Sequence, residues 1–235
     1  MTLTAETTAA LRGVTTATLT TILLKKGLRN VWIRGAMPMR EGEDRVVGPA
    51  FTFRFVPARE DLATPASWGS PVSTRAAIEE MPEGAIAVID AMGITDAGVF
   101  GDILCARMVK RGAAGLITDG VIRDRAGVMQ TGLPIWARGA AAPPSVAGLT
   151  FTGWQETVGC GGVCVVPGDV VVADADGAVV IPAAMVEEVT AEAIEQERME
   201  GWIVEEVERG EKLPGLYPMN DATRARYAAW KEGQR

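Results

Sequence analysis

Three residues that could do chemistry stand at the two ends of one short stretch of the chain. Asp102 follows Gly101 at the expected start of a helix, and Arg123 and Asp124 follow the next expected strand. Unpaired N–H groups at a helix start attract a carboxylate. An arginine can grip a carboxylate with two hydrogen bonds, and an aspartate can hold Mg²⁺ together with waters. These residue types suit a site for an acidic substrate and a divalent cation.

The segments around these residues predict that they meet in space. Residues 85–91 and 114–119 are short buried apolar runs typical of strands, and residues 102–111 have the periodicity of an amphipathic helix. A strand, a helix and a strand in succession form a parallel pair with a right-handed crossover. Ligands bind at the carboxyl ends of such strands. We therefore expect Asp102 and Arg123 at the same edge of the sheet.

Each of these residues also has a simpler interpretation. An aspartate at a helix start often only caps the helix, and an Arg-Asp pair in a turn is often a surface ion pair. The expected convergence of Asp102, Arg123 and Asp124 at one edge favours the functional interpretation.

The composition excludes several classes of function. The 235-residue chain contains no histidine, which removes Ser-His-Asp catalysis, histidine-bound zinc and imidazole acid–base chemistry. Its formal charge of −7 argues against nucleic acid as a partner. No apolar run approaches the roughly 20 residues that span a bilayer, and the N-terminus lacks a signal-peptide pattern. The three cysteines fit a reducing compartment, so we expect a cytoplasmic protein.

A Schiff-base mechanism would need a lysine with a depressed pKa. The lysines all stand in polar or helix-surface contexts and none lies within an expected strand: Lys25, Lys26, Lys110, Lys212 and Lys231. The sequence therefore argues against lysine chemistry.

The remaining N-terminal segments predict the elements that support this stretch. An apolar stripe over residues 5–27 indicates a helix that its threonine-rich centre breaks in two, with Thr15 or Thr16 capping the second part. In residues 46–56, phenylalanines alternate with Thr52 and Arg54, which predicts a half-buried strand. Further expected elements are a loop without regular structure over 57–71, a short helix over 72–80 and a strand over 134–139.

The C-terminal part predicts short strands followed by helices. Four runs indicate a meander or hairpins that close a barrel: residues 149–154, 161–166, 169–176 and 177–182. Residues 183–209 predict a charged helix with Val186, Val189 and Ala193 on its inner face. We expect one domain over residues 1–209 and a C-terminal arm over residues 210–235, with a helix from about Asp221. The arm should pack on another surface, for which a neighbouring subunit is a candidate, through Leu216, Tyr217, Tyr227 and Trp230.

Other patterns carry less information. The DADG segment at 174–177 lacks the further ligands of a calcium loop and predicts a hairpin turn. Cys160 and Cys164 have no third or fourth ligand nearby, which favours small buried residues over a metal site. Four arginines are candidates for a second carboxylate binder, and nothing ranks them: Arg29, Arg34, Arg54 and Arg59.

The pattern Asp102-x20-Arg123-Asp124-x2-Gly127, within GDILxxRMxxRGAAGLxTDGVIRD, resembles the class II pyruvate aldolases that cleave 4-hydroxy-4-methyl-2-oxoglutarate and 4-carboxy-4-hydroxy-2-oxoadipate. The resemblance extends from about residue 10 to residue 190 and includes VPGDVVVADADGAVVIP at 166–182. The same superfamily includes the regulator of ribonuclease activity A, which is a binding protein.

The resemblance implies a role for each residue of the pattern. Asp124 would anchor a divalent metal, Mg²⁺ or Mn²⁺, mostly through waters. Arg123 would hold the 2-oxo acid and stabilise its enolate, and Asp102, paired with Arg123, would position the water that protonates the enolate. The backbone at one helix start would receive the substrate carboxylate: Gly101, Ile103 and Leu104. A neighbouring subunit would add a carboxylate from its C-terminal region, for which there are three candidates: Glu195, Glu197 and Glu200.

The resemblance also implies a fold and a reaction. The expected fold is a single α/β domain of the αββα sandwich type, similar to the swivelling phosphohistidine domain, in a homotrimer or homohexamer. The expected function is metal-dependent retro-aldol cleavage of a 4-hydroxy-2-oxo acid that releases pyruvate, with oxaloacetate decarboxylation as a side activity. Two alternatives stay open: a lyase or dehydratase acting on a sugar-derived 2-oxo-3-deoxy acid, and a non-catalytic regulator that binds a ribonuclease.

Overall fold

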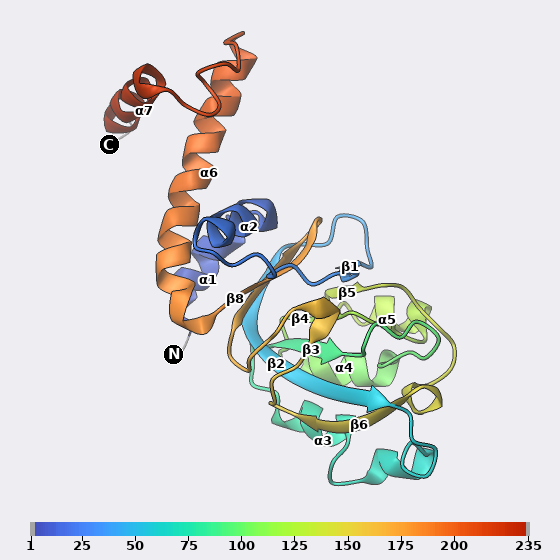
Figure 1. Ribbon diagram of the computed structural model, residues 1–235. Coiled ribbons are helices and arrows are strands. Elements are labelled where there is room, and N and C mark those ends of the chain that lie inside the picture. The colour runs from blue at the N-terminus through green and yellow to red at the C-terminus, as the bar shows by residue number, and fades with distance from the viewer. Residues whose placement is uncertain (1–2, 234–235) are drawn as a thin grey trace.

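The computed structural model describes residues 3–233, and Figure 1 shows its arrangement. The strands are β1 Met37–Pro38, β2 Val46–Pro57, β3 Ile86–Asp90, β4 Gly115–Thr118, β5 Ile135–Ala137, β6 Leu149–Trp154, β7 Val170–Asp174 and β8 Gly177–Ile181. The α-helices are α1 Ala5–Arg12, α2 Thr16–Lys25, α3 Thr74–Glu80, α4 Asp102–Lys110, α5 Arg125–Gln130, α6 Val186–Glu208 and α7 Asp221–Gly233. Short 3₁₀ helices are η1 Pro65–Gly69, η2 Ser145–Ala147, η3 Cys160–Gly162 and η4 Ala183–Met185.

An eight-stranded mixed sheet forms the centre of the molecule. Its order is β1-β5-β4-β3-β2-β7-β8, with β6 paired to β2. The pairs β2–β3, β3–β4 and β4–β5 are parallel, whereas β2 runs antiparallel to both β6 and β7. The parallel pair that the sequence predicted around residues 102–111 is therefore β3 and β4, and α4 lies in the connection between them.

The sheet curls until its two edges almost meet. The Ile33 N–H donates to the Ala178 carbonyl at 2.9 Å, and the Val180 N–H donates to the Val31 carbonyl at 2.8 Å, so residues 31–33 lie along β8 at one edge. A few residues later, β1 pairs with β5 at the other edge. The result is a nearly closed barrel, which agrees with the expected barrel-closing hairpin of β7 and β8.

Strand β3 is shared by two hydrophobic cores. Ile86 and Val88 pack inside the barrel with Trp136, whereas Ala87 and Ile89 belong to the core under α3, α4 and α5. Successive side chains of a strand point to opposite faces, and both faces are covered here. This arrangement explains why the expected strand is apolar at every position.

The N-terminal helices and α6 form a third core against the β7–β8 hairpin (Figure 1). The predicted break in the first helix is confirmed, because Thr15 caps α2 by accepting a hydrogen bond from the Thr18 N–H at 3.1 Å. The predicted inner face of α6 is confirmed too, since Val186, Val189 and Ala193 are all buried.

The C-terminal arm packs on the far end of α6 of its own chain (Figure 1). Leu216 and Tyr227 are buried there against Trp202 and Ile203, with the rings of Trp202 and Tyr227 5.4 Å apart. Leu216, Tyr227 and Trp230 thus have an intrachain partner, whereas Tyr217 is 55% exposed.

The expected strand over residues 161–166 was wrong. The chain instead forms η3 and then makes a single bridge between Val158 and Val165. Gly161 and Gly162 both have positive φ angles, of 56° and 76°, which turn the backbone out of the extended conformation.

Three smaller expectations also need correction. The loop over 57–71 contains the regular turn η1, because Pro65 presets the first helical position. Thr52 is buried rather than exposed, and its hydroxyl donates to the Glu156 carbonyl at 2.6 Å. The helical periodicity predicts Val109 on the inner face of α4 with Leu104, Cys105 and Met108, but Val109 is 38% exposed.

These features make the chain a single mixed α/β domain with C-terminal helices. Its finer assignment to the swivelling αββα type stays a prediction. Within residues 3–233, no helix combines the length and apolarity needed to cross a membrane.

Candidate active site

Two extended segments beyond the strand ends bring the candidate residues together. The Val99 N–H donates to the Val121 carbonyl, and the Arg123 N–H donates to the Phe100 carbonyl, both at 2.9 Å. These hydrogen bonds hold the start of α4 beside the turn that carries Arg123. The convergence expected from strand order is therefore created by local pairing just past β3 and β4.

Glycines allow the two segments to approach this closely. A Cβ atom at Gly101 would lie 2.7 Å from Asp124 Oδ2, and one at Gly127 would lie 2.8 Å from Asp102 Oδ2. Contacts under 3.0 Å are almost never seen for real Cβ atoms. Each carboxylate thus occupies space that the Cβ atom of any residue other than glycine would need.

Asp124 has an unusual backbone conformation. Its φ and ψ angles of 53° and 42° lie in the left-handed region, which aspartate tolerates better than most residues but at a cost of about 1–3 kcal/mol. It stands at the N-cap position of α5, yet its side chain makes no capping hydrogen bond. Such conformations concentrate at functional sites, and here the carboxylate stays half exposed and free of the helix.

Arg123 pairs with Asp124 and not with Asp102. Its Nε lies 3.1 Å from Asp124 Oδ2, without hydrogen-bond geometry, and among the described residues this buried Nε has no hydrogen-bond partner. The expected pairing of Asp102 with Arg123 is therefore absent from the described contacts. Asp102 instead accepts a hydrogen bond from the Ile103 N–H at 2.7 Å.

The start of α4 offers N–H groups that lack intrahelical acceptors. Gly101 is the N-cap residue and has no side-chain cap, so Asp102 does not cap the helix in the usual way. The first N–H groups of a helix have no partner within it. Because the Asp102 carboxylate takes the N–H of Ile103, a substrate carboxylate could use that group only after displacing it.

The predicted site residues share the lining of one pocket of about 190 Å³. They are Gly101, Asp102, Ile103, Leu104, Arg123 and Asp124. The pocket also contains residues that the sequence did not suggest, from α3, η1 and η2. Those with polar or aromatic side chains are Trp68, Thr74, Arg75 and Ser145.

Arg75 is the second cationic group of this pocket, and it was not among the expected candidates. Arg29, Arg34, Arg54 and Arg59 do not line the pocket. Arg54 and Arg59 are instead paired with Glu156 and Asp61 at 2.9 and 2.7 Å.

The donor set fits a hard divalent cation held largely by water. Within residues 3–233, no group of three or more His, Cys, Asp or Glu side chains is placed to bind a metal. Asp102 and Asp124 are carboxylates in the same pocket lining. Mg²⁺ is commonly bound by one or two carboxylates with several waters, whereas zinc sites need three or four protein ligands.

Nucleophilic alternatives do not reach this pocket. Burial, with the charge of Asp102 adding to it, raises the pKa of the Cys105 thiol to about 12, so this thiol stays protonated. Cys160 is buried as expected, but Cys164 is exposed. No lysine contributes to the lining. Lys26 forms hydrogen-bonded ion pairs with two glutamates, which raise its pKa.

All three C-terminal glutamates accept hydrogen bonds within the chain. Glu195 accepts hydrogen bonds from the Tyr227 hydroxyl at 3.0 Å and pairs with Lys231. Glu197 accepts from the backbone N–H of Thr15 at 2.7 Å. The third, Glu200, accepts from the Gln196 side chain at 2.7 Å.

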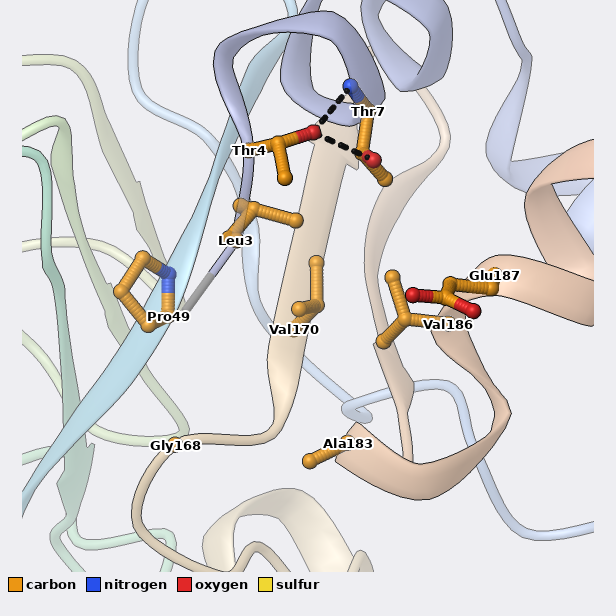
Figure 2. A pocket seen from close by; sticks show the side chains of 9 residues that line it. All are labelled: Leu3, Thr4, Thr7, Pro49, Gly168, Val170, Ala183, Val186 and Glu187. Carbon is orange, nitrogen blue, oxygen red and sulfur yellow. Dashed lines mark hydrogen bonds between the residues drawn. The ribbon is translucent and has the colours of Figure 1, made fainter. Parts of the chain in front are cut away.

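A second pocket lies where α1, β7 and the start of α6 meet (Figure 2). Its volume is about 40 Å³. The polar groups of Thr4 and Thr7 that line it bond to each other at the start of α1, as Figure 2 shows. Because its remaining lining is mostly apolar, we assign the chemistry to the pocket between α4 and Arg123.

The chain matches one protein family and is similar to several known proteins. The family model described as RraA-like, Aldolase/RraA, matches residues 16–180. A candidate 4-hydroxy-4-methyl-2-oxoglutarate aldolase of Halalkalibacterium halodurans is 33% identical over 159 residues, which cover 66% of this chain and 68% of that protein. RraAS2 of Streptomyces coelicolor, an unusual member of the RNase ES inhibitor RraA family, superposes with a TM-score of 0.77 at 34% identity, over 86% of this chain and 97% of that chain. A protein of Pseudomonas syringae pv. tomato superposes with a TM-score of 0.79 at 25% identity, over 92% and 99%.

Proposed function

Because this chain belongs to the Aldolase/RraA family, we propose that it is a divalent-metal-dependent lyase that cleaves a 4-hydroxy-2-oxo acid and releases pyruvate. Oxaloacetate decarboxylation is the proposed side activity, since both reactions pass through the same pyruvate enolate. The observation that carries the proposal is the single pocket in which Arg123, Asp102, Asp124 and the start of α4 converge.

The 2-oxo acid end of the substrate binds between α4 and Arg123 in this proposal. A carboxylate is attracted to the first N–H groups of α4, among them that of Leu104. The Arg123 side chain lines the pocket and is 33% exposed, so its terminal N–H groups can form charge-assisted hydrogen bonds to the substrate.

The proposed cofactor is Mg²⁺ or Mn²⁺, which Asp124 would hold mostly through waters. When bound, such an ion polarises the 2-oxo group and so lowers the barrier to enolate formation. The left-handed conformation of Asp124 keeps its carboxylate in the pocket lining instead of on the helix that follows.

Asp102 is proposed to position the water that completes the reaction. In the cleavage step, the 4-hydroxyl gives its proton to a water in the pocket, C4 becomes the carbonyl carbon of the second product, and the electrons of the broken C3–C4 bond form the enolate at C2 and C3. The enolate carbon C3 then takes a proton from the water that Asp102 positions, which gives pyruvate. The Asp102 carboxylate is part of the pocket lining, where it can accept a hydrogen bond from a water.

We also propose a homotrimer or homohexamer in which a neighbouring subunit contributes to each site. The resemblance to the class II pyruvate aldolases supports this assembly. So do apolar side chains left exposed along α6, namely Ile194, Val204 and Val207.

A coupled assay of pyruvate release tests the proposed function. Purified protein is incubated with oxaloacetate and with 4-hydroxy-2-oxoglutarate, in Mg²⁺ or after treatment with EDTA. Mg²⁺-dependent pyruvate formation, abolished by EDTA and restored by Mg²⁺, is the expected result. No turnover above the metal-only background with either compound would contradict the proposal.

The similarity to RraAS2 favours a second candidate, a regulator that binds a ribonuclease. A pure binding protein has no need of the Asp102, Arg123 and Asp124 set, which weighs against it. A protein that binds a ribonuclease but forms no pyruvate in the coupled assay would establish this alternative. The alternative substrate class is a sugar-derived 2-oxo-3-deoxy acid. It differs from a diacid at the end away from the 2-oxo acid, where it carries a hydroxyl group in place of a carboxylate.

A further inference from the structure

The pocket contains a cationic side chain that the proposed reaction leaves unused. We propose that Arg75 binds a second carboxylate, at the substrate end away from the 2-oxo acid, and so makes the enzyme select diacids. The inference rests on the proposed function and names the substrate class of the same site. Arg75 on α3 lines the pocket together with Trp68 on η1, whereas Arg123 lies before α5.

The charge of Arg75 is available to a ligand. Within residues 3–233, no carboxylate lies within ion-pair distance of its guanidinium. The exposed Arg107 on the neighbouring helix α4 differs, because it pairs with Glu79 at 2.6 Å. A bound carboxylate would give Arg75 the partner that Arg107 already has.

An aromatic side chain holds Arg75 in place. Its Cζ lies 5.2 Å from the centroid of the Trp68 ring, within the range of a cation–π interaction. This contact reduces the freedom of an otherwise exposed side chain and leaves the edge of the planar guanidinium available for hydrogen bonds. A guanidinium presents paired N–H groups that match a carboxylate. An exposed arginine is often only a solvated surface group, but a stacked arginine in the lining of a pocket is suited to recognition.

Two separate parts of the chain then recognise the two ends of the substrate. The start of α4 and Arg123 take the carboxylate of the 2-oxo acid, and Arg75 takes the distal one. Hydroxyls of Thr74 and Ser145 also line the pocket and could bond either a carboxylate or a sugar hydroxyl. The positive charge of Arg75 therefore distinguishes a diacid from a sugar-derived acid, because a neutral distal group gains little binding free energy from it.

Turnover by Arg75→Met tests the inference. Steady-state pyruvate release is measured with Mg²⁺ for a diacid, 4-hydroxy-2-oxoglutarate, and a monoacid, 4-hydroxy-2-oxopentanoate. For the diacid, kcat/KM should fall about 30- to 100-fold, mainly through KM, and the monoacid value should stay within about twofold. Arg107→Met, which removes an equal charge outside the pocket lining, should leave both values unchanged, and Arg75→Lys should partly restore the diacid.

Binding provides a readout that does not depend on turnover. Titration calorimetry in Mg²⁺ compares 2-oxoglutarate with 2-oxopentanoate, which cannot be cleaved because they lack the 4-hydroxyl. The wild type should bind the diacid more tightly, and Arg75→Met should lose that preference.

The outcomes separate the two proposals. Absence of turnover of every substrate by the wild type would overturn the proposed function. Turnover with an unchanged diacid preference in Arg75→Met, or a wild type that prefers the monoacid, would overturn the role of Arg75 alone.

Discussion

At the scale of single residues, the candidate site depends on glycines that leave space for the carboxylates. Gly127 stands inside α5, where an alanine would ordinarily be favoured by about 0.5–1 kcal/mol. Its missing Cβ leaves the space that Asp102 fills, since that atom would lie 2.8 Å from Oδ2 and 2.9 Å from Cβ of Asp102. Gly127 therefore serves the position of Asp102 rather than the stability of its own helix.

We predict that Gly127→Ala lowers pyruvate release at least tenfold and, because the new Cβ meets the Cβ of Asp102, lowers the free energy of unfolding by about 1–3 kcal/mol. The alanine should push the Asp102 carboxylate out of its place. Gly201→Ala is the matched control, because a Cβ there meets no atom within 4 Å in helix α6. It should stabilise the protein slightly and leave activity unchanged. Equal activity of Gly127→Ala and the wild type would refute the role of this contact.

The sequence could predict the location of these residues but not their pairing. Asp102, Arg123 and Asp124 were found because parallel strands place their carboxyl ends at one edge, which depends only on element order. The ion pair of Arg123 with Asp124 depends on a left-handed backbone at residue 124, which spacing does not encode. Arg75 was missed because it comes from a separate element that only the folded chain brings to the pocket.

At the scale of elements, Glu197 connects helix α6 to the start of α2. Its carboxylate accepts the Thr15 N–H at 2.7 Å and the Thr15 hydroxyl at 2.8 Å. Partial burial alone would raise the pKa of Glu197, but hydrogen bonds from Thr15 and Thr18 outweigh it and hold that pKa below its ordinary value. A lowered pKa in the folded state means that the ionised carboxylate stabilises the fold.

We predict that Glu197→Ala lowers the free energy of unfolding by about 1–2 kcal/mol at pH 7, since it removes charge-assisted hydrogen bonds. The stabilisation should be fully present above the unfolded-state pKa of roughly 4.3 and should be lost as the pH falls through the lower folded-state pKa. Urea unfolding at pH 7 and at acidic pH measures this difference. Glu208→Ala, at an exposed position of the same helix, should cause no loss at either pH. A difference independent of pH would contradict the assignment.

Element boundaries followed from the sequence where the hydrophobic period was clear. The α2 cap at Thr15 and the inner face of α6 could be predicted in this way. The strand expected over 161–166 failed because two glycines with left-handed backbones override the β tendency of the valines around them.

At the scale of the whole molecule, the arm and the barrel have separate cores. The cluster around Trp202 and Tyr227 is distinct from the clusters that include the sheet. Regions with few shared contacts open independently of the rest of a protein. The pocket lies in the barrel part, so the arm can open without disturbing it within one chain.

We predict that Tyr227→Ala loosens α7 without unfolding the barrel. The removal of a buried aromatic ring should cost about 2–4 kcal/mol of local stability. Hydrogen exchange should accelerate in α7 and in the far end of α6 but not in β3 or β4. Leu213→Ala changes an exposed apolar residue of the arm and should leave exchange unaltered. Acceleration throughout the sheet would show that the arm and the barrel unfold as one unit.

The most direct test of the account is the rate of Mg²⁺-dependent pyruvate release by Asp124→Asn. This change keeps the shape of the side chain and removes the charge that is proposed to hold the cation. Asp176→Asn removes the same charge from the exposed β7–β8 turn and serves as the control. With both variants folded as the wild type is, we predict that Asp124→Asn loses at least 100-fold in kcat/KM and Asp176→Asn loses nothing. Wild-type turnover by Asp124→Asn would contradict the central claim.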